Sequence, residues 1–395
     1  MGTEFREYRP ESDAEAVRVL LNAVFSTAQV SAQGWARWTA RDFTAPVAIV
    51  DGEVVGAIPL FRRTYHVAPG AEAVAWVENR VGVAEGRRDE GIGSGMQSCA
   101  KEFLRGRGDL LMVYRGAERS KGYHFYEKNG LYDVAYAFAV TLEPTQDAAE
   151  GTRWVSAEEF LAGDATWQEI FTSCYGRFGG YPTRRPGYLA DIIGTVTWQE
   201  AMRQEFSFCV AEEQGHPEGY LVLGRRQEKF QVMELAVRGG SVEWVRRLLV
   251  AARSRGASVR CSASYGCIIP AALRRLGAAL PPREQGAMMA MVHVLDIAST
   301  GQKVWRDVPA LRDVEVRVWT PQREGVIHRA AAPRRTLTLE LKEHELSRLL
   351  MRRLNAAVAV EEERITLCGE EPGDAEALAE ALAPCPWAYH PIDYL

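Results

Sequence analysis

The chain has 395 residues, a length that predicts two or three domains rather than one hydrophobic core. Hydrophobic residues make up 47% of it and charged residues 25%, the proportions of a globular protein in water. The formal net charge of −5 at pH 7 argues against a nucleic-acid-binding protein, and no apolar run is long enough to predict a membrane span.

The cysteines exclude two further classes of protein. Their number is odd, their spacing is irregular and no Cys-x-x-Cys pair is present, so the sequence predicts neither a disulfide framework nor a zinc site. We expect no metal and a reducing, cytoplasmic location, since residues 1–6 also lack the apolar core of a signal peptide. The cysteines are Cys99, Cys174, Cys209, Cys261, Cys267, Cys368 and Cys385.

Residues 1–145 alternate helical and strand patterns. A helical spacing of apolar residues covers 15–24, and strand-like runs at 47–50 and 53–58 flank the hairpin signal Asp51-Gly52. Further strands are expected at about 75–83, 109–115 and 134–142, with helices after Gly93 and at 122–129. This order predicts an α/β unit, a mixed sheet with helices on its faces.

The turn at residues 88–93 carries the pattern Arg88-x-x-Gly91-x-Gly93. It lies between a predicted strand and a helix, whose first N–H groups and partial positive charge favour a phosphate. A dinucleotide-binding turn needs Gly-x-Gly-x-x-Gly, and here Gly95 comes one place early. A nucleotide-binding loop needs Gly-Lys-Ser/Thr, which is absent. The pattern therefore predicts a pyrophosphate cradle, with a purely structural tight turn as the alternative.

A second pattern follows one strand later. Tyr126-x-x-x-Gly130 places a phenol in the last turn of a helix that Gly130 ends. An aromatic residue at helical spacing is often part of the core, but a phenol here could also give a proton to a leaving group. Cys99, on the apolar face of the preceding helix, is expected to pack rather than to react.

Residues 146–292 partly repeat the order of the first unit. We expect a hairpin from 206–210 and 219–223, then a strand at 231–237, a helix at 242–252 and a strand at 258–263. The strand-to-helix turn here reads Arg238-Gly239-Gly240-Ser241 and lacks the pattern of the first unit. From about residue 293 a third unit begins, with strand-like runs at 314–319 and 337–341 and a leucine-rich helix.

Together these motifs resemble the acetyl-CoA core of the GNAT N-acetyltransferases. The chain length, the degenerate second copy and the terminal Trp387…Tyr394-Leu395 resemble one subfamily, the Eis (enhanced intracellular survival) acetyltransferases. The resemblance implies a catalytic GNAT domain at 1–145, a degenerate GNAT-like domain at 146–292 and a sterol-carrier-protein-like α+β domain at 293–395. It also implies a homo-oligomer, often a hexamer.

The resemblance assigns roles to particular residues. Acetyl-CoA, the co-substrate, is expected along the backbone of Val81, Gly82 and Val83, and Tyr126 falls on the family's general acid. The chain-terminal carboxylate, here that of Leu395, falls on the general base, although the family usually ends on an aromatic residue. The pyrophosphate loop comprises Arg88, Asp89, Glu90, Gly91, Ile92, Gly93 and Ser94, in which Asp89 and Glu90 depart from the usual basic character.

The acceptor is expected to be a primary amine, either a small molecule or a lysine side chain. Trp35 and Trp38 occupy the region that lines the acceptor site in Eis-like enzymes, with core packing as the alternative, and Phe61 and Glu78 are further candidates. Two other functions stay open: a non-catalytic CoA- or lipid-binding regulator, and an acyltransferase that uses longer acyl-CoA donors.

Overall fold

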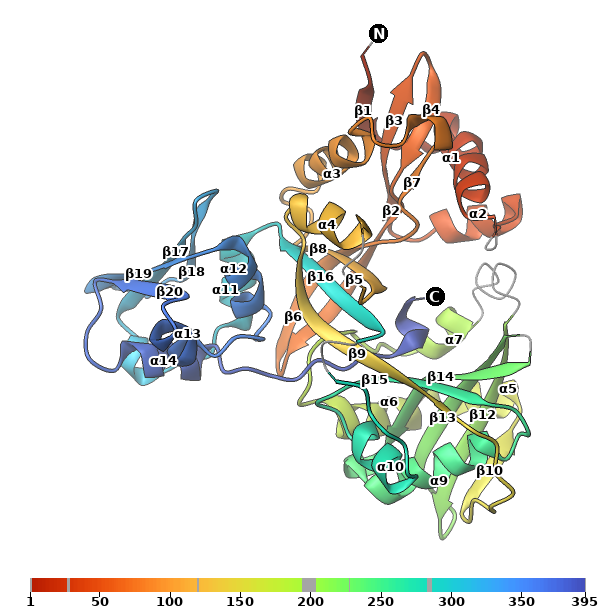
Figure 1. The fold of residues 1–395 in the computed structure, drawn as a ribbon. Coiled ribbons are helices and arrows are strands. Elements are labelled where there is room, and N and C mark those ends of the chain that lie inside the picture. The colour runs from red at the N-terminus through yellow and green to blue at the C-terminus, as the bar shows by residue number, and fades with distance from the viewer. Residues whose placement is uncertain are drawn as a thin grey trace.

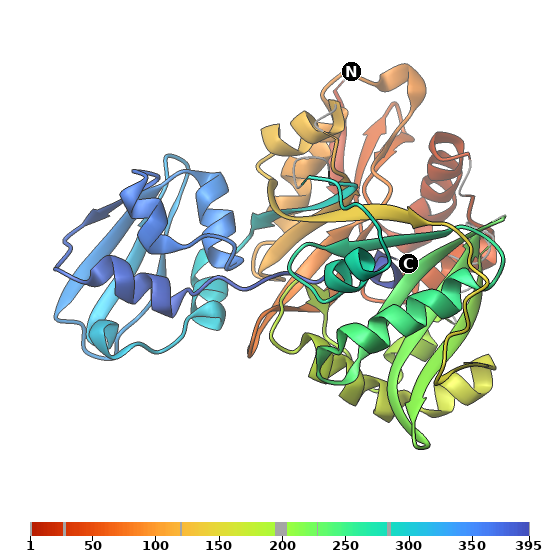
Figure 2. The same cartoon turned by 60° about the horizontal axis from the view of Figure 1, so that its bottom comes forward.

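The structure is a computed structural model that describes residues 2–26, 29–118, 121–193, 204–226, 228–282 and 286–394. The chain forms three lobes, and its C-terminal end returns from the third lobe to lie beside α7 of the second (Figure 1). Figure 2 shows the same three lobes from a second direction. Among the described residues, no helix combines the length and apolar character needed to cross a membrane.

The first lobe holds the glycine-rich turn and Tyr126. Its helices are α1 (Pro10–Val24), α2 (Ala32–Thr39), α3 (Ile92–Phe103) and α4 (Lys121–Lys128), with a short 3-10 helix η1 (Glu85–Arg87). Its strands are β1 (Glu4–Glu7), β2 (Phe43–Thr44), β3 (Pro46–Val50), β4 (Glu53–Ala57), β5 (Leu60–Ala68), β6 (Ala71–Glu78), β7 (Gly82–Val83), β8 (Leu110–Gly116) and β9 (Tyr132–Leu142).

The β3–β4 hairpin is confirmed at its turn. Asp51 and Gly52 have φ values of 52° and 83°, the pair of positive angles that a two-residue hairpin turn requires. The single strand expected at 75–83 is wrong, because Arg80 has a φ of 54° and separates β6 from β7. A regular strand does not continue through a left-handed residue. Arginine is not typical of this conformation, so nothing in the sequence indicated the break at residue 80.

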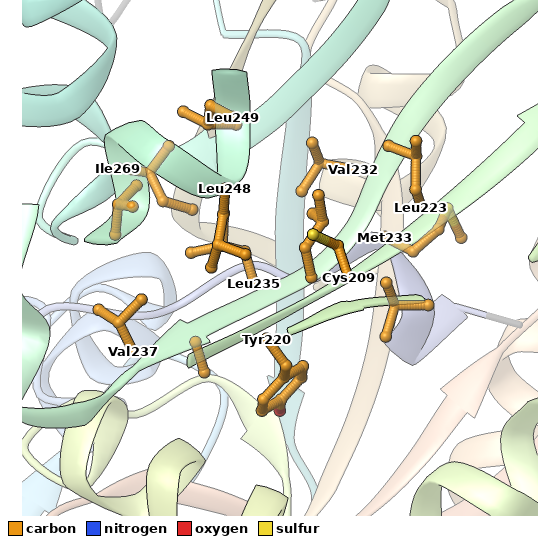
Figure 3. Packing of buried hydrophobic residues seen from close by; sticks show 14 of the residues in the cluster. Cys209, Tyr220, Leu223, Val232, Met233, Leu235, Val237, Leu248, Leu249 and Ile269 are labelled. Carbon is orange, nitrogen blue, oxygen red and sulfur yellow. The ribbon is translucent and has the colours of Figure 1, made fainter. Parts of the chain in front are cut away.

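The second lobe follows the predicted order of hairpin, strand, helix and strand. Its helices are α5 (Ala157–Ala162), α6 (Asp164–Tyr175), α7 (Tyr188–Ile193), α9 (Val242–Arg253) and α10 (Ile269–Arg275), with η2 (Arg238–Gly240). Its strands are β10 (Thr152–Val155), β11 (Tyr181–Pro182), β12 (Gln204–Glu213), β13 (His216–Arg226), β14 (Lys229–Val237) and β15 (Val259–Ser264). Figure 3 shows its core, where Leu248 of α9 lies beside Leu235 of β14, and Leu249 and Val237 belong to the same buried cluster.

One sheet runs through the first and second lobes. Its order is β10-β12-β13-β14-β15-β9-β16-β8-β6-β5-β11, with β2 paired to β5. The strand β16 (Met288–Val294) lies between β8 and β9 of the first lobe, antiparallel to both. The first lobe's sheet is therefore completed by a strand that follows the whole second lobe in sequence, and the division into three domains stays a prediction.

The third lobe is a four-stranded sheet with helices. Its helices are α11 (Ile297–Val304), α12 (Glu343–Leu350), α13 (Ala356–Glu361) and α14 (Asp374–Ala381), with η4 (Pro309–Leu311). Its strands are β17 (Val314–Trp319), β18 (Glu324–His328), β19 (Arg335–Leu341) and β20 (Ile365–Cys368), in the order β18-β17-β19-β20. Its core is continuous with apolar residues of the first lobe's sheet, such as Ala73, Ala75 and Val292, so the two lobes share one buried cluster.

The C-terminal segment joins all three lobes. Trp387 is buried, and its indole nitrogen donates to the carbonyl of Val67 on β5 at 3.1 Å. A Cβ on Gly180 would lie 2.6 Å from the Trp387 ring, so glycine is needed for this close approach. The segment ends in the 3-10 helix η5 (Pro391–Tyr394).

Candidate active site

The strands of the first lobe split beside residues 79–83. β6 and β8 pair in parallel as far as Glu78 and Val113, whereas β7 pairs with β4 in a different sheet. Arg80 lies between them in the left-handed conformation, which costs about 1 to 3 kcal/mol for a residue other than glycine and persists only where the surroundings impose it. We call the opening between residues 79–83 and β8 the notch.

The predicted pyrophosphate loop leads from η1 into α3. Gly91 is the N-cap of α3, with a φ of 81°, and it offers no side chain to the first N–H groups of the helix. The corresponding turn of the second lobe differs, because the hydroxyl of its N-cap residue Ser241 accepts from the Trp244 amide at 3.4 Å. The amides that could bind a phosphate thus lack a side-chain cap in the first lobe and have one in the second.

The two acidic residues of the loop have basic partners. Lys121 of α4 donates to both carboxylate oxygens of Asp89, at 2.8 and 3.1 Å, and Arg87 lies 3.5 Å from the Glu90 carboxylate. The hydrogen bond from Lys121 lowers the pKa of Asp89. Among the described residues Arg88 has no hydrogen-bonded carboxylate, so its charge stays available to an anion.

Two glycines of α3 are required by close packing against aromatic rings. A Cβ on Gly93 would lie 2.9 Å from the Phe125 ring of α4, and one on Gly95 would lie 2.2 Å from the Phe5 ring of β1. The contact of Gly93 places Phe125 against the loop, and the next residue along α4 is Tyr126.

A cavity of about 380 Å³ opens at the notch. Tyr126 lines it from α4, Glu78 and Val81 line it from the broken strand, and Tyr114 and Arg115 from the end of β8. Burial raises the pKa of Tyr126 well above its ordinary value, Glu78 adds to the rise and Arg115 opposes it. Tyr126 therefore keeps its proton at neutral pH, which a general acid requires.

Glu78 is one of the buried carboxyl groups of this cavity. Its side chain is 4% exposed, and both of its oxygens accept from the Gln97 amide at 2.9 Å. Burial raises the pKa of Glu78 to about 8, against a smaller opposing effect of the Gln97 hydrogen bond and Lys101. At neutral pH the carboxyl group of Glu78 is therefore largely protonated and neutral, and it becomes charged as the pH rises through about 8.

The C-terminal helix η5 reaches the same cavity. Asp393 lines it, accepts a 2.7 Å hydrogen bond from Arg184 and a 2.8 Å bond from the Tyr188 hydroxyl, and offers its backbone carbonyl to Arg63. Arg184 also donates to Glu234 of β14. The predicted base, the carboxylate of Leu395, lies two residues further on and outside the described residues.

The two predicted acceptor-site tryptophans have different surroundings. Both are buried, and their rings meet edge to face at 5.3 Å. Trp38 lines a second cavity of about 540 Å³, whose lining shares Phe61 and Arg63 with the first. Trp35 lines neither cavity and packs in the core between α1, α2 and β5.

Sequence reasoning missed three arginines of the first cavity, Arg63, Arg80 and Arg115. Arg115 carried a signal, because it comes two residues after the buried apolar run of β8 and so marks a strand end where functional side chains gather. Arg80 carried none, since its role depends on a backbone conformation that the sequence does not show.

The fold of the chain is that of the GCN5-related N-acetyltransferases. Such an enzyme from Anabaena variabilis superposes with a TM-score of 0.71 at 12% sequence identity, over 98% of this chain and 99% of that chain. One from Kribbella flavida gives 0.65 at 16% identity, over 98% and 97%.

Eis1 from Mycobacterium abscessus is also similar, with a TM-score of 0.61 at 11% identity over 99% of both chains. No protein-family model matches the sequence, and no curated protein does. At these identities the likeness establishes the fold.

Proposed function

We propose that the protein is an acetyl-CoA-dependent N-acetyltransferase that transfers an acetyl group to a primary amine. One observation carries the proposal: Tyr126, a phenol that keeps its proton, lines the cavity at the notch, and its helix packs against the turn of α3. The proposal places the pyrophosphate of acetyl-CoA at residues 88–94, and the pantetheine arm along Val81, Gly82 and Val83.

The reaction needs no covalent enzyme intermediate. The neutral amine attacks the thioester carbonyl carbon, so that a C–N bond forms while the C–S bond breaks. The amine proton goes to a carboxylate base, and the departing thiolate takes the phenolic proton of Tyr126. The base then releases its proton and Tyr126 regains one, so a neutral amine gives an acetamide and the free thiol of CoA with no net proton released.

Replacement of Tyr126 with phenylalanine tests the acid. Tyr126→Phe should lower kcat by about 100-fold or more, because general-acid catalysis typically contributes that much, while calorimetry shows unchanged acetyl-CoA binding. Tyr123→Phe is the matched control, since Tyr123 lies on the same helix and donates to Asp133 away from the cavity. Unchanged turnover in Tyr126→Phe would remove it as the acid.

Two carboxyl groups compete for the role of base. We propose the C-terminal carboxylate of Leu395, supported by the position of η5 at the cavity, and Glu78 is the rival. Deletion of Leu395 with Glu78 intact, and Glu78→Gln with the terminus intact, separate them by kcat. If Glu78 is the base, the rate should also rise with pH through about 8, the pKa of that group.

A free-thiol assay over a panel of amines, combined with calorimetry, separates this function from the alternatives. Binding of acetyl-CoA without CoA release on any amine would favour a CoA- or lipid-binding regulator. Faster release from longer acyl-CoA donors would favour a broader acyltransferase. No binding of acetyl-CoA would contradict all three.

The remaining features of the proposal come from the resemblance to Eis-like enzymes. We propose that the third lobe is sterol-carrier-protein-like, that the chain forms a homo-oligomer and that it works in the cytoplasm. The seven cysteines are all free, as a reducing compartment would keep them. Light scattering of the purified protein tests the oligomer.

A further inference from the structure

Arginine dominates the charged lining of the two adjoining cavities. Among the residues that the structure describes, six arginines and four carboxyl groups line these cavities. The arginines are Arg41, Arg62, Arg63, Arg80, Arg115 and Arg185. The carboxyl groups are Asp42, Glu78, Asp191 and Asp393.

Each of the four carboxyl groups is either protonated or paired with an arginine. Glu78 keeps its proton at neutral pH, and Asp393 is bound to Arg184. Asp42 and Asp191 pair with Arg62 at 3.2 Å and with Arg41 at 2.9 Å. The proposed base, the carboxylate of Leu395, would add one negative charge, and the six arginines would still outnumber the charged carboxylates. A polycationic acceptor would therefore meet an excess of positive charge, whereas an acceptor with a negative group would be attracted.

Arg80 is the arginine with the most constrained position. Its backbone has the left-handed conformation. Its guanidinium lies 5.6 Å from the centre of the Trp38 ring, a cation–π distance. Trp38, which lines the second cavity, thus helps to hold Arg80 in the first. Among the described residues it has no ion pair and no hydrogen bond to a carboxylate. Partial burial lowers the pKa of Arg80, and no neighbouring charge opposes this effect.

The phosphates of CoA do not account for Arg80. The proposed pyrophosphate loop is 88–94, and none of its residues lines either cavity. Arg80 shares its cavity with Phe61 and Tyr126, beside the proposed site of amine attack, where the pantetheine arm carries no charge.

We propose that the acceptor is an amine that carries an anionic group, a carboxylate or a phosphate, and that Arg80 binds this group. The proposal rests on the N-acetyltransferase function above and names its substrate class. A planar guanidinium supported on an aromatic ring suits two-point binding of such a group, and it would hold the amine next to the thioester carbon.

Matched amine pairs test the substrate class with the unmodified protein. Lysine with cadaverine and tyrosine with tyramine differ only by a carboxylate, and phosphoethanolamine differs from ethanolamine by a phosphate. In each pair with measurable turnover, the anionic member should have the higher kcat/KM, by about 10-fold or more. Which anionic group gives the larger ratio identifies the source of the charge. Equal or higher kcat/KM for cadaverine, tyramine and ethanolamine, or for the polycation spermidine, would overturn the proposal.

Substitutions of Arg80 test its role. Arg80→Gln keeps a non-glycine residue at the same backbone conformation, and should raise KM for the anionic amine about 10- to 100-fold. KM for acetyl-CoA, and kcat/KM for the matched amine without the anion, should stay within about twofold. Arg80→Lys keeps the charge but not the planar guanidinium, so its KM for the anionic amine should lie between those of the unmodified protein and Arg80→Gln. Arg317→Gln, which removes an exposed arginine of the third lobe, is the control.

The outcomes separate this proposal from the proposed function. CoA release on neutral or cationic amines alone would refute the substrate class and leave the acetyltransferase intact. No CoA release on any amine would refute the function, and the substrate class with it. Equal losses on both members of a pair in Arg80→Gln, or a raised KM for acetyl-CoA, would show that Arg80 serves the fold or the co-substrate. If Arg80→Gln does not fold, the pairs with the unmodified protein and Arg80→Lys decide.

Discussion

Glu78 ends strand β6 with its carboxyl group buried beside Gln97, and this burial makes the residue a pH-dependent element of stability. The pKa of a carboxyl group near 8 means that the folded protein holds a proton that the unfolded chain releases at about pH 4.5. Between these values the folded state binds more protons, so its stability falls as pH rises and stops falling above about pH 8.

Glu78→Gln should remove this dependence. The variant keeps an amide that can hydrogen-bond to Gln97, and its melting temperature relative to the unmodified protein should be higher at pH 9 than at pH 5. Thermal unfolding followed by circular dichroism over this range measures the difference. Glu53→Gln, at an exposed position on β4, is the control. A difference that does not vary with pH would contradict the buried, protonated state of Glu78.

Gly95 gives a second test at the scale of a residue. An alanine inside a helix is normally favoured over glycine by about 1 kcal/mol, but a Cβ here would lie 2.2 Å from the Phe5 ring. We expect Gly95→Ala to destabilise the protein by about 1 to 3 kcal/mol in urea unfolding, as overpacking typically does.

The clash itself can be isolated. The loss in Gly95→Ala should shrink in a Phe5→Ala background, where the ring is absent. Gly86→Ala, with open space around the added Cβ, should stay within about 0.5 kcal/mol. The same loss with and without the Phe5 ring would show that β1 does not pack on α3 as described.

At the scale of an element, the C-terminal helix η5 depends on one buried arginine. The side chain of Arg184 is 6% exposed, bridges Glu234 and Asp393, and lies 4.4 Å from the Phe171 ring centre and 4.2 Å from that of Tyr188. Without it two buried carboxyl groups would lose their cationic partner and keep only hydrogen bonds from the hydroxyls of Tyr188 and Tyr220.

Arg184→Gln should therefore lower the free energy of unfolding by about 3 to 5 kcal/mol, the range for breaking a buried ion pair. It should also expose the C-terminal segment to carboxypeptidase digestion. Arg153 is the matched control, since it also bridges two glutamates but is 47% exposed, and Arg153→Gln should cost about 1 kcal/mol or less. Equal losses in the two variants would contradict the anchoring role of Arg184.

Elements with a strong local signal could be predicted from the sequence, and those set by distant contacts could not. The β3–β4 hairpin, the helix after Gly91 and the helix that bears Tyr126 follow from turn chemistry and apolar spacing. The strand β5 contacts η5 through Arg63 and the third lobe through Tyr65 and Val67. Its polar and apolar residues therefore do not alternate regularly, and Arg62, Arg63 and Thr64 hide the strand in the sequence. The break at Arg80 and the pairing of Asp89 with Lys121 depend on backbone and tertiary geometry. The turn before α3 could therefore be predicted from the sequence but the ion pairs around it could not, and its role as a pyrophosphate loop stays a prediction.

At the scale of the whole molecule, the first lobe does not hold all of its own sheet. β16 occupies the space between β8 and β9 and contributes Met289 and Met291 to the core beneath α3. A fragment of residues 1–145 would expose both strands along their unpaired edges, which is a template for aggregation.

We expect the fragment of residues 1–145 to lack a cooperative unfolding transition and to aggregate, whereas residues 1–296, which retain β16, should keep more native secondary structure. Urea unfolding of the two fragments beside the full chain makes the comparison. A cooperative transition in the shorter fragment would show that the first lobe folds without β16.

The position of β16 in the sequence also delays completion of the first lobe's sheet during synthesis. Between the end of β9 and the start of β16 lie 145 residues, 143–287. At roughly 5 to 20 residues per second a ribosome needs about 7 to 30 s to make them. During that interval β8 and β9 are present on the nascent chain without β16, the strand that pairs with both. The glycine turn and Tyr126 have by then already been synthesised. The gap at the centre of the sheet is thus a place where a chaperone, or a second nascent chain, could act before the molecule is complete.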